Sequence, residues 1–204
     1  MTSRKITFAL IIVVIVLVSS YLIKTVLEPA KIINESKINK EIKDWDYTLD
    51  DRDTELMKTN FNELDNILKQ NKIDYEAYAE ALAKLYIIDL YTIDNKINSS
   101  DTPCLEYIEP SITDNFKLNI MNTLYKFVID NTNNKRKQEL PIVKEVSVTE
   151  IITEKFTLSE QEYDGYKVTL SWEYEQDLGY DKTSILNIIK KDIKLFVAKQ
   201  SNSE

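Results

Sequence analysis

Hydrophobic residues are most concentrated near the start of the chain, where Ile6–Ile23 (ITFALIIVVIVLVSSYLI) contains no charged residue. A helix of these 18 residues would span roughly 27 Å, close to the thickness of a bilayer's hydrocarbon core. The pattern predicts one transmembrane helix within residues 1–28, which ends at Glu28 because the residue before a proline avoids helical geometry. A cleaved signal peptide is the alternative, but Ser19–Tyr21 makes a poor cleavage site and hydrophobic residues continue beyond it.

Residues 29–48 are mostly polar, and we expect them to form a linker or stalk. Trp45 and Tyr47 are exceptions that we expect to pack on the outer face of the following domain, with a membrane-interface position as the alternative. Arg4 and Lys5 precede the hydrophobic run closely, whereas the lysines after it are interleaved with glutamates. A plain count of the flanking positive charges favours a cytoplasmic C-terminal part, whereas their density next to the run favours a single-pass protein of the cell membrane with an extracytoplasmic C-terminal domain.

Beyond residue 49 the hydrophobic positions follow a helical period. Met57–Leu68 carries apolar residues at i, i+4, i+7 and i+11, which predicts a first helix. A second helix is expected to begin after Asp74 and to run to Ile97, with apolar residues on nearly all sides in its middle. A third is expected to open at Pro110 and to extend to Phe127.

From residue 143 the period changes to two. Val143–Thr157 is rich in β-branched residues, and Tyr166–Tyr174 alternates strictly between apolar and polar side chains. We expect a turn at Asp164-Gly165 and a final hairpin formed by Lys182–Ile189 and Lys194–Lys199. Helices followed by strands predict an α+β domain over residues 49–200, with three helices packed on an antiparallel sheet and a frayed tail at residues 201–204.

Two helices, a short strand at 104–108, a third helix and a strand meander resemble the nuclear-transport-factor-2-like (cystatin-like) fold. The resemblance implies a curved sheet that wraps the helices into a cone with a pocket. The segments LYIIDLYTIDNKI (Leu85–Ile97), FKLNIMNTLYKFV (Phe116–Val128) and YKVTLSWEYEQDLGY (Tyr166–Tyr180) are also similar to membrane-anchored proteins of unknown function from Firmicute-type bacteria. Similar folds behind one anchor occur in assembly components of conjugation and type IV secretion machines, although a fold alone assigns no function.

Composition excludes several kinds of chemistry. The chain has no His, one Cys and two Gly, which excludes a His-containing catalytic triad, a disulfide within the chain and a Gly-rich phosphate loop. Residues 1–43 hold 7 of the 26 basic and 3 of the 34 acidic residues, so residues 44–204 hold 19 and 31, a net charge of -12. This charge disfavours nucleic acid as a partner, and we expect no metal or cofactor.

Asp89 is the most informative carboxylate because it interrupts the apolar stretch Leu85–Tyr91. A buried carboxylate must be hydrogen-bonded, paired or protonated, so Asp89 is either the acid of a pocket or a structural partner of a Tyr or Lys. Asp94 lies near the expected C-terminal end of the same helix, where the helix dipole disfavours an anion, and we expect a partner for it in the Asn98–Asp101 turn. Both remain candidate ligand-binding residues.

Trp172 and Tyr174 share one strand face and are further candidates for ligand binding, with core packing as the competing interpretation. Tyrosines and aspartates are abundant enough for an acid–base site of the ketosteroid isomerase type, but no spacing identifies one, so we assign no catalytic residue. Cys104 has no histidine to activate it and is expected to be a small buried residue. Lys135–Lys137 is a basic loop that either contacts a membrane or partner or is simply solvated.

These patterns predict a membrane-anchored, non-catalytic interaction or assembly module. It would contact the lipid bilayer through its N-terminal helix and bind protein partners or itself. The alternatives are an extracytoplasmic domain that binds or senses a small ligand in the cone pocket, and an enzyme that depends on Asp and Tyr.

Overall fold

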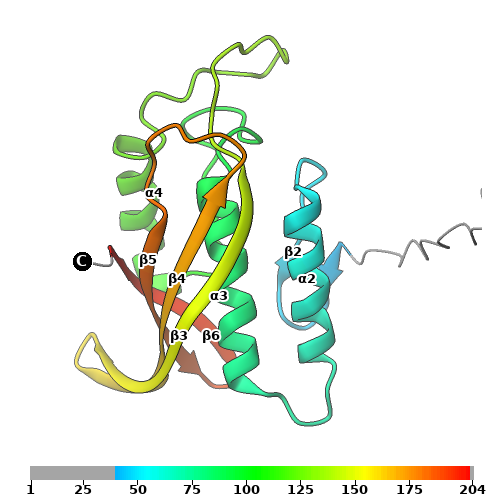
Figure 1. Cartoon of the computed structure of the whole chain (residues 1–204). Coiled ribbons are helices and arrows are strands. Elements are labelled where there is room, and N and C mark those ends of the chain that lie inside the picture. The colour runs from blue at the N-terminus through cyan, green and yellow to red at the C-terminus, as the bar shows by residue number, and fades with distance from the viewer. Residues whose placement is uncertain (1–39, 203–204) are drawn as a thin grey trace, which may run out of the picture. The chain divides into compact units, whose positions relative to one another are not determined.

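The computed structural model describes residues 40–202, which belong to the compact unit Ile38–Glu204, here called the folded body (Figure 1). Its helices are α2 (Glu55–Leu68), α3 (Tyr75–Tyr91) and α4 (Thr113–Asn122), with the single 3-10 turn η1 (Pro110–Ile112) before α4. A sheet follows, formed by β3 (Val143–Leu158), β4 (Gln161–Tyr174), β5 (Thr183–Lys191) and β6 (Lys194–Ser201). Its strands are antiparallel and neighbour one another in chain order. The predicted α+β class, with three helices and an antiparallel sheet, is confirmed.

The predicted membrane helix Ile6–Ile23 lies outside the described residues. Within residues 40–202, no helix combines the length and the hydrophobicity needed to cross a bilayer.

Helix α3 forms the centre of the folded body, between the sheet and α2 (Figure 1). Its sequence is apolar on nearly every side, so both neighbours can bury hydrophobic surface against it. Each leucine or isoleucine buried there contributes about 1.5–3 kcal/mol relative to exposure. The side chain of Asp74 caps the helix by accepting from the backbone N–H groups of Glu76 and Ala77 at 3.1 and 3.2 Å, as expected.

Helix α3 ends at Tyr91, so the prediction that it runs to Ile97 is wrong. The backbone N–H groups of Ile93 and Asp94 both donate to the carbonyl of Pro141, which takes the chain away from the helix axis. Ile93 is nevertheless fully buried. Its hydrophobicity therefore reflects packing of the loop rather than another helical turn.

The turn predicted at Asp164-Gly165 also needs correction. The loop between β3 and β4 is at Ser159 and Glu160, whose φ angles are 49° and 67°. Such left-handed residues suit a tight hairpin, but neither is the Gly or Asn that usually indicates one. Gly165 lies inside β4, where a Cβ atom would approach the carbonyl oxygen of Ile188 to 2.1 Å. This glycine is needed for close strand packing and not for a turn.

The chain between α3 and β3 differs from expectation as well. Residues 104–108 form a turn that meets the sheet at a single parallel bridge between Ile108 and Val197. Helix α4 stops at Asn122, short of the expected Phe127, and buries only Ile120. The segment after α4 therefore leaves several large side chains on the surface.

A hairpin precedes α2, formed by β1 (Glu41–Ile42) and β2 (Tyr47–Thr48). Tyr47 is fully buried, and its hydroxyl lies 2.5 Å from that of Tyr78 on α3. Trp45 packs edge-on against the same Tyr78 ring at 5.6 Å between ring centres. Residues 40–48 of the predicted linker therefore belong to the folded body, and Tyr47 packs inside the domain rather than on its outer face.

We expect Tyr47→Ala to lower the free energy of unfolding by about 3–5 kcal/mol, because it removes a fully buried ring and one partner of the Tyr78 hydroxyl. Urea unfolding followed by fluorescence measures this change. A loss below about 1 kcal/mol would mean that the hairpin only rests on the surface.

Candidate functional site

A polar cavity of ≈ 260 Å³ lies where the loop before α2, the end of α3 and residues 101–107 meet. Seven charged residues line it: Asp50, Arg52, Asp53, Asp89, Lys96, Asp101 and Glu106. Five of the seven are acidic, so we call this the acidic cavity. Its position beside a sharp change in chain direction after α3 brings together residues that are far apart in the sequence.

Asp89 and Lys96 form a buried ion pair at one wall of the acidic cavity. The Lys96 ammonium lies 2.5 Å from the Asp89 carboxylate, and Lys96 is only 7% exposed. The second oxygen of Asp89 accepts from the backbone N–H of Cys104 at 2.6 Å. Burial disfavours the charged form of Lys96, but the charge and hydrogen bond of Asp89 outweigh it and raise the pKa of Lys96.

Arg52 forms ion pairs with two further carboxylates of the cavity. Its guanidinium lies 3.0 Å from Asp50 and 2.6 Å from Asp101, and it also donates to the carbonyl of Asn95. Hydrogen bonds from Arg52 lower the pKa of Asp50, against the opposing effect of burial. These contacts tie the loop before α2 to the loop after α3.

Asp53 and Glu106 have hydrogen bonds but, in the described part of the chain, no ion pair. Asp53 accepts from the backbone N–H of Asp50, and Glu106 accepts from the backbone N–H and the hydroxyl of Thr48. Burial raises the pKa of both carboxyls, that of Glu106 to about 7. Perturbed carboxyls in a concave polar site are typical of functional residues.

Two uncharged groups of the lining also lack partners. The Tyr107 hydroxyl and the amide oxygen of Asn95 are buried without a hydrogen bond of normal geometry. The Tyr107 hydroxyl lies close enough to Glu106 to lower the pKa of that carboxyl, although burial has the larger effect.

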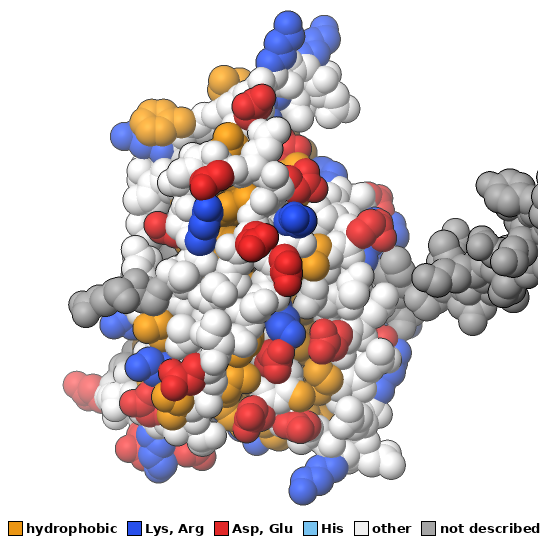
Figure 2. Space-filling model, viewed as in Figure 1, with side chains coloured by type: hydrophobic (Ala, Val, Ile, Leu, Met, Phe, Trp, Pro, Cys, Tyr) orange, Lys and Arg blue, Asp and Glu red, His pale blue; other side chains and the backbone are white. Residues whose placement is uncertain are grey.

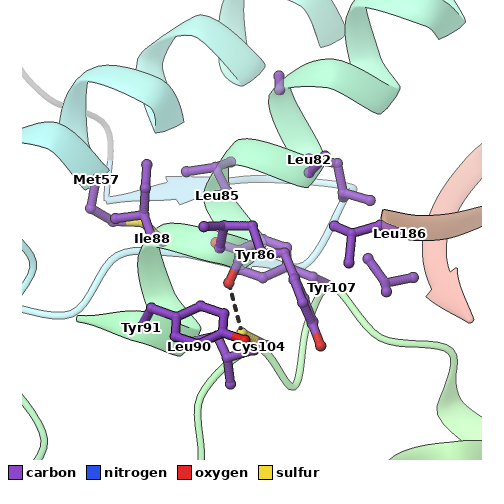
Figure 3. Packing of buried hydrophobic residues seen from close by; sticks show 14 of the residues in the cluster. Met57, Leu82, Leu85, Tyr86, Ile88, Leu90, Tyr91, Cys104, Tyr107 and Leu186 are labelled. Atoms are coloured by element: carbon purple, nitrogen blue, oxygen red, sulfur yellow. Dashed lines mark hydrogen bonds between the residues drawn. The ribbon is translucent and has the colours of Figure 1, made fainter. Parts of the chain in front are cut away.

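Figure 3 shows Tyr107 packed with Tyr86 and Cys104, whose thiol donates to the Tyr86 carbonyl at 3.3 Å. Burial raises the pKa of the Cys104 thiol well above its usual value, and Cys104 is a small buried residue as expected.

Of the four ligand-binding candidates, the structure brings only Asp89 into the acidic cavity. Asp94 is half-exposed, and its carboxylate lies 3.7 Å from Arg136, so its partner is not in the Asn98–Asp101 turn. Trp172 and Tyr174 line a separate hollow of ≈ 450 Å³ at the sheet. Both are largely buried, and Trp172 packs on Tyr91 at 4.6 Å between ring centres, as core packing requires.

Sequence reasoning missed Glu106, Asp53, Lys96 and Tyr107. Glu106 did carry a signal, since it is the one charged residue of the segment Cys104–Ile108. That signal is the same as for Asp89, a carboxylate in an apolar run. Asp53 and Lys96 had none, because acidic and basic residues in polar loops are usually solvated.

A second feature is the segment after α4, residues 123–137, here called the apolar–basic loop. Phe127 is 76% and Ile129 59% exposed, and the Lys126 ammonium lies 5.2 Å from the centre of the Phe127 ring. Lys135 and Lys137 are exposed on the same loop. In Figure 2, basic side chains and a large hydrophobic one gather at the upper end of the molecule, where Figure 1 draws the chain between α4 and β3.

Hydrogen bonds hold the backbone of the apolar–basic loop in place. The Arg136 side chain is only 2% exposed and donates to the carbonyls of Asp94, Lys96 and Ile129. The Gln138 amide donates to the carbonyl of Phe127 and accepts from the N–H of Ile129. Arg136 is therefore a structural residue, and the exposed lysines on either side supply the positive charge of the loop.

Within residues 40–202, no group of three or more Cys, Asp or Glu side chains has an arrangement that could hold a metal ion. The chain matches no protein-family model, and neither a curated protein nor a solved structure is similar to it. The candidate sites are therefore defined by geometry and chemistry alone.

Replacing Asp89 by Leu should lower the free energy of unfolding by about 3–5 kcal/mol, because Lys96 would remain buried without its partner. The double variant Asp89→Leu/Lys96→Met removes both charges and should recover at least half of this loss. Urea unfolding of the two variants measures the difference. Equal losses in both would show that the ion pair is not what stabilises this end of α3.

Glu106→Gln should stabilise the folded body at pH 8 by about 2–3 kcal/mol and change little at pH 4.5. The pKa of Glu106 is raised from 4.5 to about 7 on folding. The folded chain therefore holds more protons than the unfolded chain between these values, and stability falls as the pH rises through them. Thermal unfolding at both pH values checks this, with Glu139→Gln, an exposed glutamate, as the control. A pH-independent difference would show that the Glu106 carboxyl is not buried as described.

Proposed function

We propose that this protein is a membrane-anchored, non-catalytic interaction module. Ile6–Ile23 would hold it in the cell membrane as a single-pass protein, and the folded body would bind a protein partner on the extracytoplasmic side. The observation that carries the proposal is the exposure of Phe127 and Ile129 on the apolar–basic loop. Large hydrophobic side chains exposed together on a soluble surface favour an interaction site.

The fixed geometry of the loop supports a protein partner rather than the bilayer surface. Arg136 and Gln138 hold the backbone on both sides of the exposed residues. A preformed loop loses little conformational freedom on binding, which favours a specific interface with an aromatic anchor such as Phe127. Insertion between lipids requires no such fixed arrangement.

The charge of the loop supports an acidic partner surface. Residues 123–137 contain Lys126, Lys135, Arg136 and Lys137 against Asp130, a net charge of +3 within a body that is strongly acidic. A positive patch of this kind attracts a complementary negative surface and orients the encounter. Because an anchor confines both partners to one membrane, modest affinity at the interface would be enough.

We also propose that the folded body has a specific α+β fold, the nuclear-transport-factor-2-like cone. The order of two helices, a short segment, a third helix and a four-stranded meander supports a nuclear-transport-factor-2-like cone. In such a cone the helices would lie in the concave face of the sheet, and the contacts of α3 with β3 and β4 are compatible with this arrangement.

A ligand-binding or sensing domain is the second candidate function. The acidic cavity favours it, since buried carboxyls with raised pKa values converge there with unpartnered polar groups. Both functions can belong to one chain, because the cavity and the exposed side chains of the loop are made by different residues.

The interaction proposal predicts site-specific crosslinking. A photoreactive residue at position 129 of the full chain, in its own membranes, should capture one acidic protein. The same residue at position 193 should not, although Ile193 and Ile129 are both 59% exposed. Charge reversal by Lys135→Glu and Lys137→Glu should lower the yield about tenfold or more, because close charge pairs contribute 1.5 kcal/mol or more to association.

The captured protein should then bind the purified full chain, and Phe127→Ser should weaken this binding about tenfold with little effect on stability. Adducts with lipid alone, or equal yields at positions 129 and 193, contradict the proposal.

A further inference from the structure

We infer that the acidic cavity is a binding site for a small organic ammonium ion, a primary amine in its protonated form. The inference goes beyond the interaction module and does not depend on the membrane anchor or the apolar–basic loop. Three observations carry it: the charge left over in the cavity, the kind of polar atoms that lack partners there, and the cavity volume.

The charges of the lining do not balance. Arg52 and Lys96 form ion pairs with three carboxylates, those of Asp50, Asp101 and Asp89. Even these paired residues therefore carry one excess negative charge. Asp53 and Glu106 add two carboxyls without a cation. With all of its carboxyls ionised the lining would carry a net charge of -3, from five acidic and two basic residues. A cation entering the cavity would reduce this excess.

The unpartnered polar atoms are acceptors. The amide oxygen of Asn95 can only accept, and the Tyr107 hydroxyl can accept as well as donate. Tyr107 is 1% exposed and lines the cavity, and its hydroxyl lies close to Glu106 without a hydrogen bond of normal geometry, so its burial there is costly. An ammonium group has three N–H donors and no acceptor, which complements this lining. A carboxylate or phosphate ligand would meet mainly other acceptors.

The cavity volume limits the size of the ligand. A volume of ≈ 260 Å³ corresponds to roughly nine water molecules at about 30 Å³ each. This accommodates a short aliphatic amine and is smaller than the pockets that hold drug-sized ligands. No cluster of three or more Cys, Asp or Glu in the described residues is arranged for a metal ion, and the cation we infer is organic.

Binding should be coupled to proton release. Burial raises the pKa of Glu106 to about 7, whereas an ammonium ion needs the carboxylate. Glu106 interacts through charge or hydrogen bonds with groups from several elements. These are Asp89 from α3, Tyr47 and Thr48 from β2, Lys194 from β6, and Cys104 and Tyr107 from its own turn. Burial raises the pKa of the Tyr47 and Tyr107 hydroxyls and of the Cys104 thiol well above their usual values, and it lowers the pKa of Lys194. The ionised fraction of Glu106 rises about tenfold between pH 6 and pH 8, and affinity should rise by up to the same factor.

Isothermal titration of the full chain in mild detergent, in phosphate buffer, tests the inference. Three probes of similar size separate its elements: n-propylammonium, tetramethylammonium, which is a cation without N–H donors, and propionate. We expect saturable 1:1 binding of n-propylammonium, at least tenfold weaker binding of tetramethylammonium, and none of propionate. Affinity for n-propylammonium should be higher at pH 8 than at pH 6.

Glu106→Gln should weaken n-propylammonium binding at least tenfold at pH 8, whereas the surface variant Glu139→Gln should not change it. Because Glu106→Gln is expected to be more stable than the parent at pH 8, its loss of binding cannot be attributed to unfolding, and thermal unfolding of the same samples verifies this. No saturable binding at millimolar n-propylammonium, equal binding of tetramethylammonium, or unchanged binding in Glu106→Gln would overturn the inference. Crosslinking at position 129 is unaffected by any of these outcomes, so the two proposals fail separately.

Discussion

The ion pair between Asp89 and Lys96 fixes the end of α3, and the acidic cavity depends on it. A helix that is buried on nearly every side tolerates a carboxylate only when both of its oxygens are compensated. One oxygen of Asp89 binds Lys96, and the other accepts from the N–H of Cys104. Cys104 begins the turn that carries Glu106 and Tyr107. One carboxylate therefore positions the wall of the cavity relative to the hydrophobic core.

The acidic cavity and the apolar–basic loop share one short piece of backbone. Arg136, from the loop, donates to the carbonyls of Asp94 and Lys96, and the Lys96 side chain lines the cavity. The two features have opposite charge and different chemistry, so each suits a different kind of partner. Residues 94–96 nevertheless contact both features, so an internal and an external surface of the folded body are built on the same backbone segment.

The regular parts of the fold follow from periodicity, and the sites do not. The alternation of apolar and polar residues in Tyr166–Tyr174 predicted strand β4. The apolar character of Leu85–Tyr91 predicted the buried middle of α3. Each pattern matches one geometry of the backbone. The burial of Tyr47 was not predictable, since its partner Tyr78 is 31 residues away. The turn at Ser159 was hidden because its positive φ is adopted without Gly or Asn.

The candidate site shows the same limit more strongly. Asp89 was found because a charge within an apolar helix is improbable unless it has a partner. Asp53 and Lys96 come from polar loops, and only the change in chain direction after Tyr91 brings them together. Convergence of loops is a tertiary property that a local pattern cannot encode.

The burial of the only cysteine gives this chain a built-in reporter of its own opening. The Cys104 thiol is 2% exposed, donates to the Tyr86 carbonyl and has a pKa well above the usual value, so in the closed state it is a poor nucleophile. Alkylating reagents should modify it only when the core around α3 separates. Under conditions where reclosing is fast, the rate of modification would measure the equilibrium between closed and open states, without any engineered probe.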